Sequence, residues 1–167
     1  MYPTVQDFVN DYAKESGMTQ KLLDRLTDAS LKQPVGEGYR TLGHLAWHLV
    51  PSGGIFTQAG LRFEAPNTDA QSPVSAAEIA EAYRTVSKRV IEAVQAQWTD
   101  ADLQLEHIVF GQPWKNGYTL LQFMKHEIHH RGQLTILMRQ AGLPVTGMYG
   151  PAKEEWEFAG RSAPVLA

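Results

Sequence analysis

Residues 119–142 read TLLQFMKHEIHHRGQLTILMRQAG and decide the fold of this chain. The segment has no internal Pro, Tyr118 or Thr119 begins it, and it ends at Gly142 as a C′ glycine with Pro144 just beyond, so it predicts one long helix. Its apolar residues fall on more than one side: Leu120, Leu121, Phe123, Met124, Ile128, Leu134, Ile136, Leu137 and Met138. A helix that is apolar around most of its circumference is surrounded by other helices.

Three further segments carry the apolar spacing of helices that can surround it. They span residues 4–27, 41–60 and 75–97. Thr41 is a suitable N-cap for the second, and Pro51 predicts a kink or break inside it. Ser75 followed by Glu78 predicts a capping box at the start of the third.

The remaining segments have weaker signals. Residues 63–75 predict a loop, residues 105–110 a brief strand or an extended crossing, and residues 154–158 a short helical piece. Four helices with little strand signal predict an all-α fold, a four-helix bundle formed by a single domain over residues 1–167. The long connection between the second and third helices predicts a crossover in place of simple up-down-up-down order.

Composition excludes several classes of function. The 167 residues contain no Cys, so thiolate zinc sites, iron–sulfur clusters and a cysteine nucleophile are excluded. The net charge is −3, and no Lys/Arg run exists that would neutralise a row of phosphates, so we expect no nucleic-acid partner. No apolar run is long enough to span a membrane and the N-terminus does not resemble a signal peptide, so we expect a cytoplasmic protein without a membrane partner.

Histidine gives the strongest chemical signal. Five of the six His lie on two predicted helices, and they include two pairs with four-residue spacing, His44/His48 and His126/His130. Residues four apart lie one turn apart on one helix face, where their rings can share a cation. Up to four imidazoles can therefore converge if the two helices pack together. Spacing alone leaves three and four ligands equally open, and also leaves open ordinary core roles for these histidines.

A competing motif overlaps the second pair. Residues 126–130 formally match H-E-x-x-H, the metallopeptidase pattern in which Glu127 would be the general base. The metzincin extension is missing, because Gln133 and Ile136 stand where Gly and His are required. No convincing edge strand is available to hold an extended peptide, so the metallopeptidase is a remote alternative.

The string His126-Glu-Ile-His-His-Arg-Gly-Gln133, with Thr41-Leu-Gly-His-Leu-Ala-Trp-His48 upstream, resembles the DinB-like (YfiT-like) superfamily of helical metalloproteins. Residues 147–156 are similar to the tail that often closes such chains. The resemblance implies a divalent metal held by His48, His126 and His130, with zinc or nickel expected. It leaves His44 as a nearby residue that lines the substrate site but does not bind the metal.

The resemblance also implies an activity. The family includes metal-dependent transferases and isomerases that use a low-molecular-weight thiol such as bacillithiol, mycothiol or glutathione. A chain without Cys would need such a thiol as cosubstrate, and a metal lowers the pKa of a bound thiol or water. We therefore expect a metal-dependent thiol S-transferase or a related hydrolase that acts on a small-molecule substrate. The alternative is a metal-binding stress-response module without turnover, and the resemblance further implies a homodimer.

Three residues near the motif have secondary roles in this interpretation. Gln133 lies two turns beyond His126 and is expected either to line the substrate site or to make an interhelical hydrogen bond. Arg131 is expected to pair with a carboxylate or cap a loop. Glu127 is expected to be a solvated or paired carboxylate, with orientation of a neighbouring ligand as the alternative.

Overall fold

The computed structural model describes residues 2–64, 75–156 and 160–165. The helices are α1 (Val5–Leu23), α2 (Leu42–Leu49), α3 (Ile55–Gln58), α4 (Ala76–Gln97), α5 (Asn116–Gln140) and α6 (Lys153–Trp156). Short 3₁₀ turns lie at Ser30–Lys32, Pro51–Gly54 and Ala101–Gln104, and the antiparallel strands are β1 (Glu106–Val109) and β2 (Gln112–Lys115). The predicted all-α fold class is confirmed. The predicted loop 63–75 and the end of the predicted helical piece 154–158 fall largely outside the described residues.

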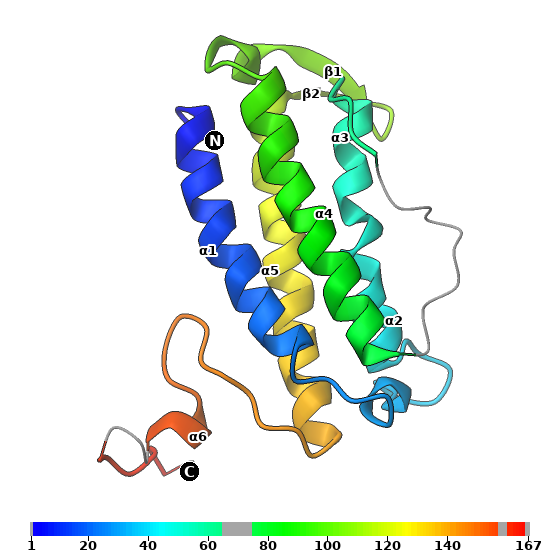
Figure 1. Cartoon of the computed structure of the whole chain (residues 1–167), viewed down its shortest axis with the longest axis vertical. Helices are drawn as coiled ribbons and strands as arrows, with labels where there is room; N and C mark the ends of the chain where they lie inside the picture. Colours follow the sequence, from blue (N-terminus) through cyan, green and yellow to red (C-terminus); the bar gives the residue numbers. More distant parts are fainter. Residues whose placement is uncertain (1, 65–74, 157–159, 166–167) are drawn as a thin grey trace.

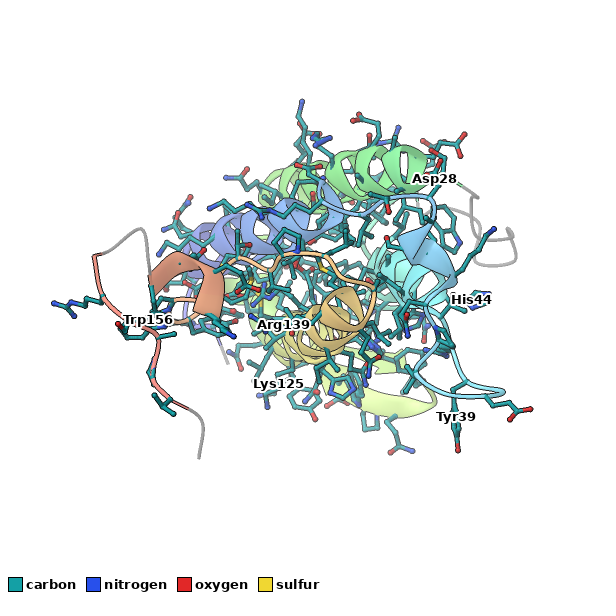
Figure 2. The ribbon with its side chains drawn as sticks, turned by 90° about the horizontal axis from the view of Figure 1, so that it is seen from below. Asp28, Tyr39, His44, Lys125, Arg139 and Trp156 are labelled. Atoms are coloured by element: carbon teal, nitrogen blue, oxygen red, sulfur yellow. The ribbon has the colours of Figure 1, made fainter. Side chains whose placement is uncertain are left out.

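Four helical columns lie side by side, formed by α1, α4, α5 and the stacked pair α2–α3 (Figure 1). Seen from below, α4 and α5 occupy opposite sides, with α1 and α2 between them (Figure 2). Accordingly, α1 packs against α4 and α5, and α2 packs against the same two helices. In Figure 1, α1 and α5 run downward whereas α2–α3 and α4 run upward. The chain therefore departs from up-down-up-down order, as the long connection before residue 75 predicted.

Local sequence signals fix most helix ends. The Ser75 hydroxyl accepts a hydrogen bond from the Glu78 N–H and caps α4. Gly142 follows α5 with φ 76°, and the next residue donates its N–H to the Met138 carbonyl, the Schellman arrangement that favours glycine. The first helix ends at Leu23, four residues before the predicted end, and Thr27 and Ser30 form a separate hydrogen-bonded turn beyond it.

The second column is broken at Pro51, as predicted. Pro51 lacks an N–H, so α2 ends at Leu49 and a 3₁₀ turn leads into α3. The start of α2 is fixed by Thr41, whose hydroxyl accepts from the His44 N–H at 3.3 Å. A Cβ at Gly43 would lie only 3.1 Å from the Leu31 carbonyl oxygen, so glycine lets α2 approach that backbone closely. These features set the position of the helix that carries His48.

The region before α5 is a β-hairpin. The expected brief strand is present as β1, but its partner β2 and the tight turn between them were not predicted. The turn residues Phe110 and Gly111 have φ of 51° and 74°, the positive values typical of a two-residue hairpin turn. Pro113 lies in β2, which is acceptable because the sheet has only edge strands. As a result α5 begins at Asn116, slightly before the predicted start.

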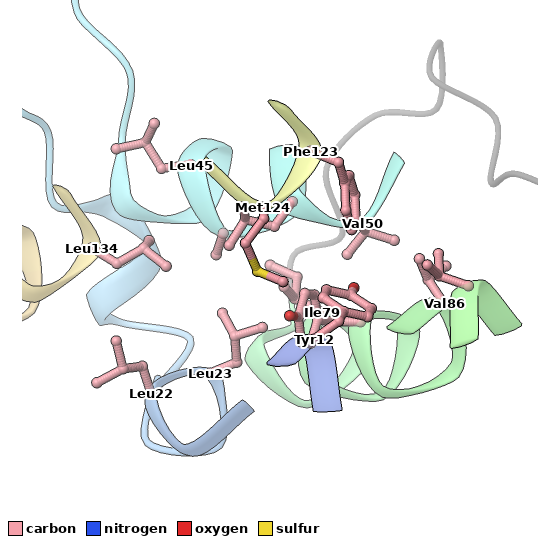
Figure 3. Packing of buried hydrophobic residues seen from close by; sticks show 14 of the residues in the cluster. Tyr12, Leu22, Leu23, Leu45, Val50, Ile79, Val86, Phe123, Met124 and Leu134 are labelled. Atoms are coloured by element: carbon pink, nitrogen blue, oxygen red, sulfur yellow. The ribbon is translucent and has the colours of Figure 1, made fainter. Parts of the chain in front are cut away.

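The core lies between the four columns. Tyr12 from α1, Ile79 from α4 and Phe123 from α5 are almost fully buried, and Figure 3 shows them with Val50 and Met124. The rings of Tyr12 and Phe123 are 5.1 Å apart, a distance typical of packed aromatic pairs. This packing fixes how α5 is rotated relative to its neighbours. Among the described residues, no helix is long and apolar enough to cross a membrane.

Candidate metal centre

Three histidines from two helices meet where α2 packs on α5. His48 comes from the last turn of α2, and His126 and His130 come from successive turns near the middle of α5. His130 is buried, whereas His48 and His126 are half-buried. The four-residue spacing on α5 directs both of its rings toward α2, as a helix geometry of 3.6 residues per turn requires. The structure thus brings together the three residues that the resemblance implied.

The distances fit a shared ion. The Nε2 atom of His126 lies 3.1 Å from Nε2 of His48 and 3.1 Å from Nε2 of His130. One ligand atom from each residue lies within 4.8 Å of the others. Nitrogen ligands bonded to tetrahedral zinc at about 2.0–2.1 Å are about 3.3 Å apart, so only small shifts would be needed.

Gln133 fixes the protonation of one ring. The Nδ1 atom of His130 lies 2.7 Å from Oε1 of Gln133, and a hydrogen bond there requires Nδ1–H to be the donor. In a neutral ring the lone pair is then on Nε2, which faces the other two histidines. The three Nε2 atoms face one another, and the N–H groups of these rings cannot give each of them a hydrogen-bond partner. A shared cation satisfies them, and this donor set therefore fits a divalent metal.

The electrostatic surroundings favour neutral imidazoles. Burial, followed by the charges of nearby histidines, lowers the pKa of His126 to about 4. Burial is also the largest cause of the lowered pKa values of His48 and His130. All three rings are therefore neutral at pH 7, which is the form that binds metals.

Two cavities, each of about 410 Å³, adjoin the histidines. The α2 cavity is lined by residues that include Arg40, His44, Trp47 and His48. The α5 cavity is lined by residues that include Val35, Arg40, His130, Gln133, Ile136 and Leu137. Both volumes fall within the range of small-molecule sites. A ligand in either cavity would contact at least one of the three histidines.

His44 is not brought to the other three histidines. Its side chain lies on the outer side of α2 (Figure 2), where Nδ1 is 3.4 Å from the Thr41 backbone nitrogen and completes a capping box. The ring nevertheless lines the α2 cavity. The pair His44/His48 therefore consists of one helix-capping residue and one member of the cluster.

We predict that His44→Ala leaves zinc binding at one equivalent per chain. The variant loses half of a capping box, while the Thr41 hydroxyl still caps the helix, so unfolding free energy should fall by less than about 1 kcal/mol. Metal analysis and chemical denaturation measure the two quantities. Loss of the bound zinc would show instead that His44 is a ligand.

Gln133 was expected to line the substrate site or to bond another helix. It does line the α5 cavity, but its hydrogen bonds go to two histidines of its own helix, through Oε1 to His130 and through Nε2 to His129. Its spacing from His130, three residues on a helix, is the signal that would have predicted the contact.

This contact predicts a measurable effect on metal affinity. Gln133→Leu removes the acceptor of the His130 Nδ1–H, and residues that orient ligands in this way are worth about 10- to 100-fold in affinity. We expect that much weaker zinc binding by competition with a chelator. Gln140→Leu, an exposed position further along the same helix, is the control and should bind zinc like the parent. Equal zinc affinities of the two variants would mean that Gln133 does not orient the ring of His130 for metal binding.

Glu127 was expected to be a solvated or paired carboxylate, and the solvated alternative was wrong. Its side chain is buried, and Oε1 accepts hydrogen bonds from the hydroxyls of Thr19 at 2.8 Å and Tyr83 at 2.5 Å. Burial raises the pKa of Glu127, against the opposing effect of these two hydroxyls. The carboxyl group therefore lies between α1, α4 and α5 and lines neither cavity. A metallopeptidase would need this group beside the metal as a base, so the structure gives that alternative no support.

Arg131 pairs with a carboxylate, as expected, although it is fully buried. Its guanidinium forms an ion pair with Glu15, donates to the Glu15 carbonyl at 2.8 Å and contacts the Thr19 hydroxyl at 3.3 Å. It also donates to the hydroxyl of Tyr149 in the C-terminal tail. These bonds tie α1 and the tail to the part of α5 that carries the histidines. No local sequence pattern indicates this polar network, because the partners of Arg131 lie more than 100 residues away or in a loop.

Comparison with known proteins gives consistent matches. The model of the DinB family matches residues 1–163. The chain is 47% identical to the uncharacterized protein YrdA of Bacillus subtilis (strain 168), with 99% of this chain and 100% of that protein covered.

Two solved structures are also similar. A DinB-like protein from Bacillus cereus ATCC 10987 superposes with a TM-score of 0.86 at 45% identity and covers 89% of this chain and all of its own. The DinB-like protein YjoA from Bacillus subtilis has a TM-score of 0.66 at 19% identity, covers 87% of this chain and 99% of its own, and shares the fold alone.

Proposed function

We propose that this chain, which belongs to the DinB family, is a metalloenzyme that acts on a small molecule. In this proposal His48, His126 and His130 hold one divalent ion, with zinc or nickel expected. The reaction is a thiol S-transfer or a related hydrolysis. The observation that carries the proposal is the meeting of three Nε2 atoms from α2 and α5 beside two cavities.

The residues around the cluster support a reactive site over a purely structural one. A bound divalent ion supplies Lewis acidity, which makes a thiol or water more acidic near neutral pH. Three protein ligands leave a coordination position open, whereas structural zinc sites normally have four. His44, the obvious fourth candidate, caps α2 instead. The cavities give a substrate access to the cluster, and Gln133 holds the ring of His130 in one orientation.

Metal analysis of protein purified without an affinity tag tests the metal. After incubation with zinc, nickel or manganese and removal of the excess, we expect about one ion per chain for at least one of them. A stoichiometry near zero with all three would overturn the proposal.

A second experiment separates the enzyme from a metal-binding module without turnover. The cobalt-substituted protein is titrated with 2-mercaptoethanol, glutathione or cysteine while its visible spectrum is recorded. Direct binding of sulfur should produce a thiolate-to-cobalt charge-transfer band. An unchanged spectrum with every thiol would remove thiol transfer and leave hydrolysis or the non-catalytic module.

A further inference from the structure

One loop borders both cavities. Loop 34–41 is closed at its base by a bridge between Pro34 and Thr41, and the Val35 N–H donates to the Arg40 carbonyl at 3.0 Å. These contacts fix the position of Tyr39 and Arg40 between the two cavities. Both residues line the α2 cavity and the α5 cavity. Figure 2 shows Tyr39 and His44 on the same side of the molecule.

Arg40 brings an uncompensated positive charge to this position. Its side chain is exposed and makes no ion pair with any residue of the described ranges. No carboxylate is present among the described residues that line either cavity. The charge of Arg40 also contributes to the lowered pKa of His48, His126 and His130, so it acts on the whole cluster.

The α5 cavity adds an apolar wall. Val35 and Ile136 are 55% and 61% exposed, and Leu45 and Leu137 form the buried part of the wall. His130 and Gln133 lie on the same lining. A ligand that fills this cavity thus meets hydrocarbon, one guanidinium and the edge of the histidine cluster.

We propose that the α5 cavity binds a small monocarboxylic acid, whose carboxylate pairs with Arg40 and whose apolar body packs on Val35, Ile136 and Leu137. This inference rests on the proposed function and names the class of substrate that would reach it. Guanidinium is the side-chain group best matched to a carboxylate, because its planar fork donates two parallel hydrogen bonds.

The test compares acids with their neutral amides. Octanoate and 4-phenylbutyrate are titrated into zinc-loaded protein, alongside octanamide and 4-phenylbutyramide, and the methyl resonances of Ile136 and Val35 are followed by NMR. A hydrogen bond to a charged group predicts that at least one acid binds about tenfold more tightly than its amide. Arg40→Gln should remove this preference, leave amide binding unchanged and retain one zinc per chain.

Arg62→Gln is the matched control, since Arg62 is an exposed arginine that lines neither cavity. It should keep the preference for acids. The inference is overturned if no probe shifts these methyl resonances, if acids and amides bind equally, or if the preference survives in Arg40→Gln. Should zinc stoichiometry be zero, the proposed function fails, and the same titrations on metal-free protein still decide the role of Arg40.

Discussion

The His126→Ala variant should fail to retain the one zinc ion that we expect in the parent protein. His126 is central to the cluster, because its Nε2 atom lies 3.1 Å from those of both other histidines. Its removal leaves one imidazole on each of two helices, and we expect affinity to fall by at least about 100-fold, beyond the effect of residues that only orient ligands.

Thermal unfolding gives an independent measure of this effect. For the parent, zinc at about 100 times its dissociation constant should add about 2.7 kcal/mol to the stability, which raises Tm by roughly 5–10 °C in a chain of this size. The variant should show no such shift at the same zinc concentration. Its far-ultraviolet circular dichroism should match the parent, because a half-buried ring contributes little to the core.

His129→Ala is the control for this prediction. His129 is an exposed histidine of the same helix, outside the cluster. The control should keep one zinc per chain and the increase in Tm. Equal zinc retention by His126→Ala and the parent would mean that the metal, if any, binds elsewhere.

Arg131→Met should destabilise the protein by about 3–5 kcal/mol. The guanidinium is 2% exposed in its side chain and is paired with Glu15, so its loss leaves a largely buried carboxylate without its cation. The Glu15 carbonyl and the Tyr149 hydroxyl also lose a donor. For a chain of this size the loss corresponds to a Tm lower by roughly 6–20 °C.

The matched control for this change is Arg139→Met on the same helix. Arg139 pairs with Glu154 at 3.0 Å, but both side chains are more than a third exposed. An exposed ion pair of this kind contributes at most about 1 kcal/mol. Chemical denaturation of the two variants gives the comparison. A difference between them below about 1 kcal/mol would mean that the buried network does not stabilise the fold.

The helices could be predicted because their signals are local. The apolar spacing, the Ser75 cap, the break at Pro51 and the C′ position of Gly142 all depend on residues within one turn of one another. The hairpin could not be predicted in full, because β2 contains a proline and has no strong alternation of apolar and polar residues. The turn at Thr27 and Ser30, which lies beyond the end of α1, likewise depends on side-chain hydrogen bonds that compete with a helix.

The candidate site was predictable only in part, for a different reason. Spacing identified two histidine pairs, and the family resemblance selected His48, His126 and His130 from them. The distinct role of His44 depends on its bond to Thr41, which competes with any ligand role. The burial of Glu127 depends on α1 and α4, which the sequence around the motif does not describe. Contacts between distant segments of the chain thus decided the role of Glu127, whereas a residue three positions away decided that of His44.

X-ray absorption at the zinc edge of the loaded protein tests directly whether His48, His126 and His130 together bind one zinc ion. We expect scattering from three imidazole nitrogens at about 2.0–2.1 Å, with at least one further oxygen, nitrogen or sulfur ligand from solvent or substrate. His126→Ala should remove one imidazole from that shell or release the zinc. A spectrum with fewer than three imidazoles in the parent, or a parent that retains no zinc, would contradict the account.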